Sequence, residues 1–400
     1  MKYKELSLGE LVSFVSKGIP PKYTEIKTKD SIVVLNQKTN RNFQIDYSLS
    51  RLNDLTKKKV PKDKILIDND ILINSTGVGT AGRIAQLVKV PELTTVDGHM
   101  IIVRPEVEKI DPLYLGYALK AQQAKIEGLQ EGSTGQTELN RQRLLKDIIV
   151  RFPESRRLQQ KISKLFFFLD EKIENNKKIN HHLEQMAMAI FKSWFIDFEP
   201  FGGKMPSDWR IANLTDIAEY LNGLAMQKYR PLDDEEGLPV LKIKELRQGT
   251  FDSSSDLCSA KINSQYIVKD GDVIFSWSGS LLVDFWTGGT GGLNQHLFKV
   301  SSQNYDKWFY YSWTKYHLEE FAAIAADKAT TMGHITRSSL KKAEVLIPNN
   351  QDYKFLALLL APIYDQIIYN RVENHRLMEA RNTLLPKLLS GEICVNQATK

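Results

Sequence analysis

The chain has few of the features that mark exported, membrane-spanning or zinc-binding proteins. Its two cysteines, Cys258 and Cys394, are far apart and form no CxxC pair. We therefore expect neither a disulfide framework nor a structural zinc site. No run of about 18 uninterrupted apolar residues occurs, so no membrane span is expected. The opening MKYKELSLGE lacks an apolar signal core, which makes the cytoplasm the expected location.

Signatures of several enzyme classes are also missing. Neither the phosphate-binding pattern GxxxxGK(S/T) nor the tetrapeptides NPPY and DPPF of adenine methyltransferases occur. The glycine-rich segments 77–82 and 288–292 favour turns over a nucleotide site, because neither opens a helix followed about 20 positions later by an acidic residue. His99 and His296 lack companions at metal-ligand or general-base spacing. The residues thus offer no candidate catalytic or metal site.

The composition is that of a globular protein with a mild excess of positive charge. With 42 % apolar and 26 % charged residues, the 400-residue chain predicts two to four domains. The formal net charge of +6 suits a nucleic-acid binder, but it is uneven. Residues 1–152 hold 24 Lys and Arg against 18 Asp and Glu, whereas residues 206–348 hold 15 against 18. A DNA-binding face in the second half must therefore come from local arrangement.

The main organisational feature is an internal duplication with a period near 200 residues. The aligned segments are 3–23 with 209–229, 68–79 with 270–281, and 144–153 with 339–348. His99 corresponds to His296. A period of this length indicates two copies of a whole domain, joined here by the linker PFGGKMP at 200–206.

Each copy is expected to be a mixed domain of short strands and one helical segment. The predicted strands are 31–35, 65–74, 100–103 and 148–152 in the first copy, and 239–243, 272–277, 297–300 and 344–347 in the second. The predicted helical segments are 111–129 and 305–326.

Residues 156–198 predict one long helix. In a heptad frame its a positions include Leu169, Asn176, Leu183 and Ile190, and its d positions include Ile179 and Met186. The frame recurs 194 residues later at Ile363, Asn370, Leu377 and Leu384. We therefore expect two helices that pair through these eight residues. Our hypothesis is that Asn176 and Asn370 meet and fix the register.

Aromatic residues crowd two parts of the first long helix. The triple phenylalanine 166–168 should pack on a globular domain or on a partner protein, because it is too apolar for a free helix flank. The end of the helix carries Phe191, Trp194, Phe195 and Phe198, which we predict to dock a partner subunit.

Polar segments rich in hydrogen-bond donors occur at equivalent places in both copies, namely 133–143 with 330–342 and 36–41 with 242–248. Such side chains suit phosphate contacts and base-edge recognition. The alternative is a solvated loop, or for the two histidines a local hydrogen bond. The candidate DNA contacts are Lys22, Asn36, Gln37, Lys38, Arg41, Ser75, Thr76, Arg83, His99, Thr134, Gln136, Thr137, Asn140, Arg141, Lys228, Lys242, Lys244, Arg247, Ser276, Ser278, Gln295, His296, Thr330, Thr331, His334, Thr336 and Arg337.

These features together resemble the specificity (S) subunit of type I restriction-modification enzymes. The resemblance covers almost the whole chain. It rests on KMPSDWRIANLTDIAEYLNG (204–223), LPVLKIKELRQG (238–249), DGDVIFSWSG (270–279), GSTGQTELNRQRLLKDIIVRFP (132–153), LLPKLLSGEI (384–393) and the central KINHHLEQMAMAIFKSWFIDFEP (178–200).

The resemblance implies an α+β fold with two target-recognition domains and two long antiparallel helices that form a coiled coil. It places the first domain at 1–153, the central helix at 154–199, the linker and second domain at 200–348, the second helix at 349–392 and a tail at 393–400. Each domain would recognise one half of a bipartite double-stranded DNA site, and the helices would set the spacer.

The resemblance also implies partners. Two methyltransferase (M) subunits would bind, and restriction (R) subunits would join the full complex. S-adenosylmethionine, ATP and Mg²⁺ would belong to those partners, and this chain would catalyse nothing. Two alternatives stay open at this point. One is a coiled-coil interaction scaffold without a DNA role, and the other is a stand-alone DNA-modifying enzyme with an unrecognised site.

Overall fold

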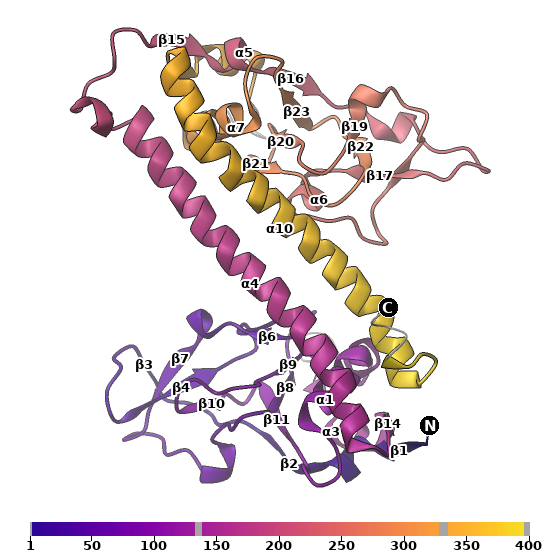
Figure 1. The fold of residues 1–400 in the computed structure, drawn as a ribbon. Helices are drawn as coiled ribbons and strands as arrows, with labels where there is room; N and C mark the ends of the chain where they lie inside the picture. Colours follow the sequence, from indigo (N-terminus) through magenta and orange to yellow (C-terminus); the bar gives the residue numbers. More distant parts are fainter. Residues whose placement is uncertain (1, 133–137, 328–334, 396–400) are drawn as a thin grey trace. The chain divides into compact units, whose positions relative to one another are not determined.

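The computed structural model describes residues 2–132, 138–327 and 335–395. They form two compact units, one of residues 1–170 and 379–400 and the other of residues 171–378. Each unit combines one copy of a mixed domain with parts of two long helices, as Figure 1 shows. Among the described residues, no helix is long and apolar enough to cross a membrane.

The first copy contains two four-stranded sheets. Its strands are β1 (Tyr3–Ser7), β2 (Val12–Lys17), β3 (Tyr23–Thr24), β4 (Ser31–Leu35), β5 (Asn40–Arg41), β6 (Gln44–Ile45), β7 (Arg51–Asp54), β8 (Ile71–Asn74), β9 (Ile84–Gln86), β10 (Thr94–Val96), β11 (Met100–Pro105), β12 (Gln130–Glu131), β13 (Glu138–Leu139) and β14 (Ile149–Pro153). Its helices are α1 (Pro112–Ala121), α2 (Gln123–Glu127) and α3 (Arg141–Asp147), with 3₁₀ turns at Leu8–Leu11, Tyr47–Leu49 and Lys62–Lys64. The central sheet has the antiparallel order β2-β11-β8-β9, and the second sheet has the order β10-β4-β7-β3 with β10 and β4 parallel.

The second copy repeats this plan. Its strands are β15 (Arg210–Asn213), β16 (Glu219–Asn222), β17 (Leu238–Leu241), β18 (Leu257–Cys258), β19 (Ile267–Val268), β20 (Val273–Ser276), β21 (Leu282–Phe285), β22 (Gly291–Leu293), β23 (Leu297–Ser301) and β24 (Glu344–Ile347). Its helices are α5 (Leu214–Ile217), α6 (Ile243–Gln248), α7 (Lys307–Tyr316), α8 (Leu318–Asp327) and α9 (Arg337–Lys342), with 3₁₀ turns at Glu199–Phe201, Met226–Lys228 and Ser264–Tyr266. The sheets have the orders β16-β23-β20-β21 and β18-β17-β22-β19, and β17 and β22 are parallel.

A glycine stands where the chain leaves the first strand of each central sheet. A Cβ atom at Gly18 would lie 2.1 Å from the carbonyl oxygen of Val96, and one at Gly223 would lie 2.2 Å from that of Asn294. Contacts this short are forbidden, so only glycine allows the two backbones to approach. The same constraint at the same place is independent support for the duplication.

Central strands of both copies are buried on both faces, which matches their continuous apolar runs. All four residues of β8 and all four of β20 are buried. The predicted strand 65–74 is shorter in the structure, because residues 65–70 form a turn before β8. The glycine-rich segment 77–82 forms the tip of the β8–β9 hairpin, as predicted, whereas Gly291 and Gly292 belong to β22.

The two long helices are α4 (Arg156–Phe195) and α10 (Asn350–Ser390). In the second unit their seam includes Ile173, Asn176, Asn180 and Ala187 on α4, all of which are buried. Ile179 and Met186 are 46 % and 53 % exposed, so their assignment to the seam was wrong. The seam follows positions a and e of the predicted frame, which lie about 40° apart around a helix.

All eight residues predicted to pair the helices are buried or half-buried. Asn176 and Asn370 are buried, and the six apolar residues Leu169, Leu183, Ile190, Ile363, Leu377 and Leu384 are half-buried. Asn176 donates a hydrogen bond to Asn374 (2.9 Å), and Asn370 donates one to Asn180 (2.8 Å). The two asparagines thus do not bond each other as hypothesised. Each bonds an asparagine one helical turn away from the expected partner.

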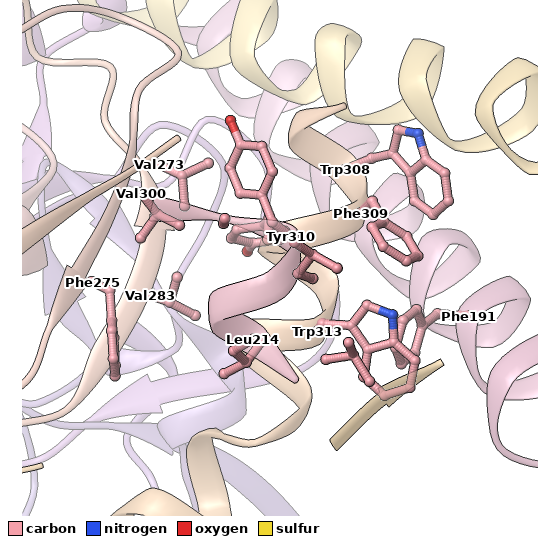
Figure 2. Packing of buried hydrophobic residues seen from close by; sticks show 14 of the residues in the cluster. Phe191, Leu214, Val273, Phe275, Val283, Val300, Trp308, Phe309, Tyr310 and Trp313 are labelled. Carbon is pink, nitrogen blue, oxygen red and sulfur yellow. The ribbon is translucent and has the colours of Figure 1, made fainter. Parts of the chain in front are cut away.

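The aromatic end of α4 is part of the core of the second unit. Phe191 packs edge-on against Trp313 at 5.0 Å between ring centroids (Figure 2), and Phe195 lies 5.4 Å from Trp209. Trp194 and Phe198 are half-buried against the same core. The prediction that these rings dock a partner was wrong for Phe191 and Phe195, because the domain's own aromatic helix α7 covers them.

Phenylalanines 166–168 divide between core and surface. Phe166 is fully buried in the core of the first unit, where it lies 5.5 Å from the ring of Tyr117. Phe168 is 64 % exposed. Phe167 is half-buried against the same core. The expectation that this triplet packs on a globular domain therefore holds for Phe166 and Phe167 and not for Phe168.

Candidate nucleic-acid interface

One edge of the central sheet in the first copy carries several predicted contact residues. Met100 at the start of β11 pairs with Asn74 at the end of β8, and its neighbour Ile101 pairs with Lys17 at the end of β2. The segments beyond these residues must therefore emerge at the same edge. Thr76 and His99 do so, and the Thr76 hydroxyl lies 2.8 Å from Nδ1 of His99.

The described part of the segment 133–143 is anchored at this edge. The backbone N–H of Leu139 donates to the carbonyl oxygen of Ser75 at 2.7 Å, and Glu138 forms an ion pair with Lys17. Asn140 caps α3 by accepting the N–H of Arg143 at 3.0 Å. Arg141, the first residue of that helix, is exposed. The cap thus fixes where the Arg141 side chain starts.

The loop 36–41 reaches the same edge through a buried asparagine pair. Asn74 donates to the carbonyl oxygen of Gln37 at 3.2 Å, and Asn40 donates to Asn74 at 3.1 Å. Lys38 and Arg41 stay exposed. The structure therefore brings together four segments of the first copy that the sequence had proposed separately.

The other candidates of the first copy occupy less exposed or more distant places. Asn36 and Gln37 are half-buried, and Asn36 accepts the N–H of Lys38 at 2.9 Å to close a turn. Arg83 is half-buried and donates to the carbonyl oxygen of Gly79 at 2.9 Å. Lys22 is exposed beside β3.

An equivalent edge exists in the second copy. Leu297 pairs with Ser276, so Trp277 and His296 emerge together, and their ring centroids lie 5.8 Å apart. The N–H of Ile335 donates to the carbonyl oxygen of Trp277 at 3.0 Å, which anchors the end of the second polar segment. The Trp277 indole also donates to Asn222 at 2.9 Å. Sequence reasoning missed Trp277, although it is the only aromatic residue in the phrase SWSG.

The remaining second-copy candidates at this edge are polar side chains around His296. Gln295 lies beside it, with 3.4 Å between the side-chain Nε2 atoms. Thr336 precedes α9 and is half-buried, and Arg337 is the first residue of that helix and is exposed. Arg337 therefore has the same helical position in its copy as Arg141 has in the first.

Two lysines at the start of α6, its N-cap Lys242 and Lys244, are held by carboxylates. Lys242 forms an ion pair with Asp256, and Lys244 forms one with Asp252 at 3.1 Å. Hydrogen bonds from Ser254 and then from Lys244 hold the pKa of Asp252 well below its usual value. Arg247 on α6 and Lys228 near β16 are exposed. The second copy thus offers fewer unpaired cations on this segment than the sequence suggested.

Three serines proposed as DNA contacts are buried. Ser75 and Ser276 have no exposed surface, and Ser278 has 6 %. The Ser276 hydroxyl donates to the carbonyl oxygen of Ser280 at 2.9 Å, and that of Ser75 lies within 3.5 Å of the carbonyl oxygen of Gly98. The Ser276 hydroxyl closes the turn after β20, because a short polar side chain readily bonds nearby backbone. The Ser75 hydroxyl instead joins the end of β8 to the segment before β11. Their assignment as contacts is corrected accordingly.

Some candidates lie outside the described residues, namely Thr134, Gln136, Thr137, Thr330, Thr331 and His334. Within the described ranges, no three His, Cys, Asp or Glu side chains are grouped so that they could hold a metal ion. The edge of each central sheet therefore presents hydroxyl, imidazole, amide and guanidinium groups, which are the groups that contact DNA bases and phosphates.

Comparison with known proteins identifies relatives over most of the chain. A family model described as the type I restriction modification DNA specificity domain matches residues 1–185 and 206–376. The MjaIX type I restriction enzyme specificity subunit of Methanocaldococcus jannaschii is 27 % identical over 381 residues, which cover 89 % of this chain and 85 % of that protein. The HindI specificity subunit of Haemophilus influenzae is 21 % identical over 98 % of this chain and 99 % of that protein.

A solved structure shares the fold. The type I restriction-modification S subunit from M. genitalium matches with a TM-score of 0.61 and 15 % identity, covering 97 % of this chain and 96 % of that chain. Both matches of the family model contain one copy of the duplicated domain, and each extends into the long helix that follows it.

Proposed function

Because the chain belongs to the family of type I restriction-modification DNA specificity subunits, we propose that each of its two mixed domains recognises one half of a bipartite DNA site. The observation that supports this most is the repeated edge: His99 with Arg141 in one copy, and His296 with Arg337 in the other. In each copy a histidine immediately precedes a central strand, β11 or β23, and an arginine is the first residue of a short helix, α3 or α9. Bases would be recognised by the imidazole and amide groups, and phosphates by the exposed cations.

The long helices would set the distance between the two half-sites. A 40-residue helix is about 60 Å long, which is of the order of two turns of duplex DNA. The spacer would then depend on the number of residues in α4 and α10 and not on the domains. Inserting one heptad into each helix should lengthen the spacer and leave both half-sites unchanged.

Methyltransferase subunits would dock on apolar surface that the helices leave uncovered. Met186 on α4 and Leu358 on α10 are 53 % and 78 % exposed, and Phe355 is 49 % exposed one turn from Leu358. Phe355 and Leu358 are three residues apart and so lie on one face of α10. Exposed apolar residues of this kind commonly mark an interface. These residues, with Met186, replace the buried rings of Phe191 and Phe195 as the proposed docking site.

The chain itself would contribute recognition and no catalysis. S-adenosylmethionine, ATP and Mg²⁺ would be bound by the methyltransferase and restriction subunits. The purified chain alone and its complex with the M subunits can each be incubated with DNA and S-adenosylmethionine, and methyl transfer to the DNA is measured. Methyl transfer by this chain alone would contradict the proposal.

Domain exchange tests the assignment of half-sites. Residues 206–348 are replaced by the corresponding domain of another specificity subunit, and the methylated motif is determined by sequencing DNA from cells that also carry the M subunit. We expect one half-site to change while the other half-site and the spacer are preserved. A change in both half-sites, or in neither, would refute the modular assignment.

A further inference from the structure

A polar hollow lies at the edge of the second sheet of the first copy. Strands β3 and β7 pair in the antiparallel register Tyr23 with Asn53 and Thr24 with Leu52. The same register places Glu25 opposite Arg51, just beyond the end of β3. The cavity has a volume of about 480 Å³ and is lined by Tyr23, Thr24, Glu25, Ser50, Arg51 and Leu52.

Arg51 is stacked on an aromatic ring at the mouth of this hollow. Its Cζ atom lies 3.5 Å from the centroid of the Tyr23 ring, and Arg51 is exposed. A guanidinium held flat on an aromatic face loses rotational freedom, while its N–H groups still point outward in the plane of the fork. Arg51 is therefore oriented for a partner that accepts two hydrogen bonds side by side.

Tyr23 lies near the recognition edge described above. Besides burial, the charge of the Asp97 carboxylate raises the pKa of the Tyr23 hydroxyl, and Asp97 is 4 % exposed. The same carboxylate accepts the N–H of His99 at 2.9 Å. Tyr23 and Asp97 thus lie between the hollow and the candidate interface, within one unit.

The two charged groups of the hollow match one kind of base pair. In the major groove, guanine presents two adjacent acceptors, O6 and N7, which an arginine fork bonds together, and cytosine presents the N4 donor, which a carboxylate accepts. A phosphate offers acceptors only and would be repelled by Glu25, so a phosphate contact explains Arg51 but not Glu25. Adenine and thymine do not present two adjacent acceptors to the fork.

We propose that Arg51, stacked on Tyr23 and facing Glu25, recognises a G·C base pair in the half-site of the first domain. This inference rests on the proposed function, since it assumes that the first domain contacts DNA in the major groove. It adds residues outside the polar segments that the sequence singled out, because Arg51 lies on a regular strand and carries no motif of its own.

The test uses the complex reconstituted with its M subunits and a set of duplexes that vary each position of the methylated motif. We expect Arg51→Ala to reduce the preference for G·C at one position of the first half-site by roughly 5- to 150-fold. Preferences in the second half-site should not change. Arg51→Lys should not restore the lost preference, because lysine lacks the planar fork. Lys57→Ala is the matched control, since Lys57 is a cation of the same domain with an exposed side chain.

Three outcomes overturn the inference. The first is an unchanged preference in Arg51→Ala. The second is an equal loss of affinity for every duplex together with a smaller salt dependence, which would identify a phosphate contact. The third is an equal effect of Lys57→Ala. If the unaltered complex shows a bipartite preference in these assays, only the role of Arg51 fails. If it shows none, the proposed function fails as well.

Discussion

The side-chain amide of Asn370 on α10 donates a 2.8 Å hydrogen bond to the side-chain carbonyl of Asn180 on α4. One turn along, Asn176 donates to Asn374 at 2.9 Å. The side-chain amides of the two accepting asparagines also have partners. Asn180 donates to the carbonyl oxygen of Ile367, and Asn374 donates to that of Ile173. In any other register of the two helices these buried amides would lose their hydrogen-bond partners, which is unfavourable. These four residues therefore fix how the helices align in the second unit.

Removing one member of this set should destabilise the second unit. Asn370→Leu leaves the Asn180 carbonyl oxygen buried without its donor, and we expect a loss of about 1–3 kcal/mol in the free energy of unfolding. Denaturation in urea, followed by circular dichroism, measures it. Asn175→Ala is the control, since Asn175 is an exposed asparagine on α4, next to the buried Asn176. A loss in the control as large as in Asn370→Leu would show that the effect is not due to the buried bond.

The four asparagines also show what the sequence could and could not predict. The spacing Asn-x-x-x-Asn occurs at 176–180 and again 194 residues later, at 370–374. The duplication of the helices was predicted from the heptad frame, which recurs at the same interval. The residues that form the seam could not be predicted in the same way, because α4 is apolar on more than one face. Ile179 and Met186 fit a heptad as well as Ile173 and Ala187 do, and only the position of the partner helix decides between them.

The candidate site was predictable by segment and not by residue. The polar segments meet at one sheet edge because the strands between them pair, and strand order was not available from the sequence. Thr76 and Ser75 are neighbours of the same polar character, yet one faces His99 and the other is buried. Side chains alternate across an extended backbone, so a single residue decides between surface and core. Arg51 escaped notice for the related reason that its ring partner lies on another strand.

Lys120 in the first unit should give stability that rises with pH. Burial lowers the pKa of Lys120 to about 8. The Asp170 carboxylate, 3.2 Å away, opposes this shift only in part, because the Arg381 guanidinium also pairs with that carboxylate. The unfolded chain keeps the lysine proton up to about pH 10.4. Between about pH 8 and pH 10 the unfolded state therefore binds more protons, and the free energy of unfolding increases as the pH rises.

Comparison with Lys120→Met isolates this contribution. Urea unfolding of both proteins is measured between pH 7 and pH 10, and the difference is plotted against pH. We expect the unaltered protein to gain on the order of 1–3 kcal/mol relative to the variant over this interval. Titration of other groups cancels in the difference. A difference that stays constant, or that falls as the pH rises, would contradict the lowered pKa.

The exposed cations of the two copies should contribute differently to the salt dependence of DNA affinity. Arg41 is exposed and its guanidinium bonds the carbonyl oxygen of Lys38, whereas Lys244 is neutralised by Asp252. We expect Arg41→Ala to reduce the slope of log affinity against log salt by about 0.9, the value of one phosphate contact. Lys244→Ala should change the slope less, and Asp252→Asn should raise affinity. Binding of the complex with M subunits is measured over a range of KCl concentrations. Equal slopes for the Arg41 and Lys244 variants would refute the difference.

Core and docking surfaces on the long helices can be separated by a matched pair of substitutions. Phe191→Ala removes a ring from the aromatic core of the second unit and should cost about 3–5 kcal/mol of unfolding free energy. Met186→Lys, five residues earlier on α4, alters an exposed apolar side chain and should change that free energy by no more than about 0.5 kcal/mol.

Met186→Lys should instead weaken association with the M subunit, because a desolvated lysine in an apolar interface is unfavourable. Titration and analytical ultracentrifugation measure this association. Gln185→Lys, at the neighbouring exposed position, controls for added charge alone. If Met186→Lys bound the M subunit as tightly as Gln185→Lys, the exposed face of α4 would not be the docking surface.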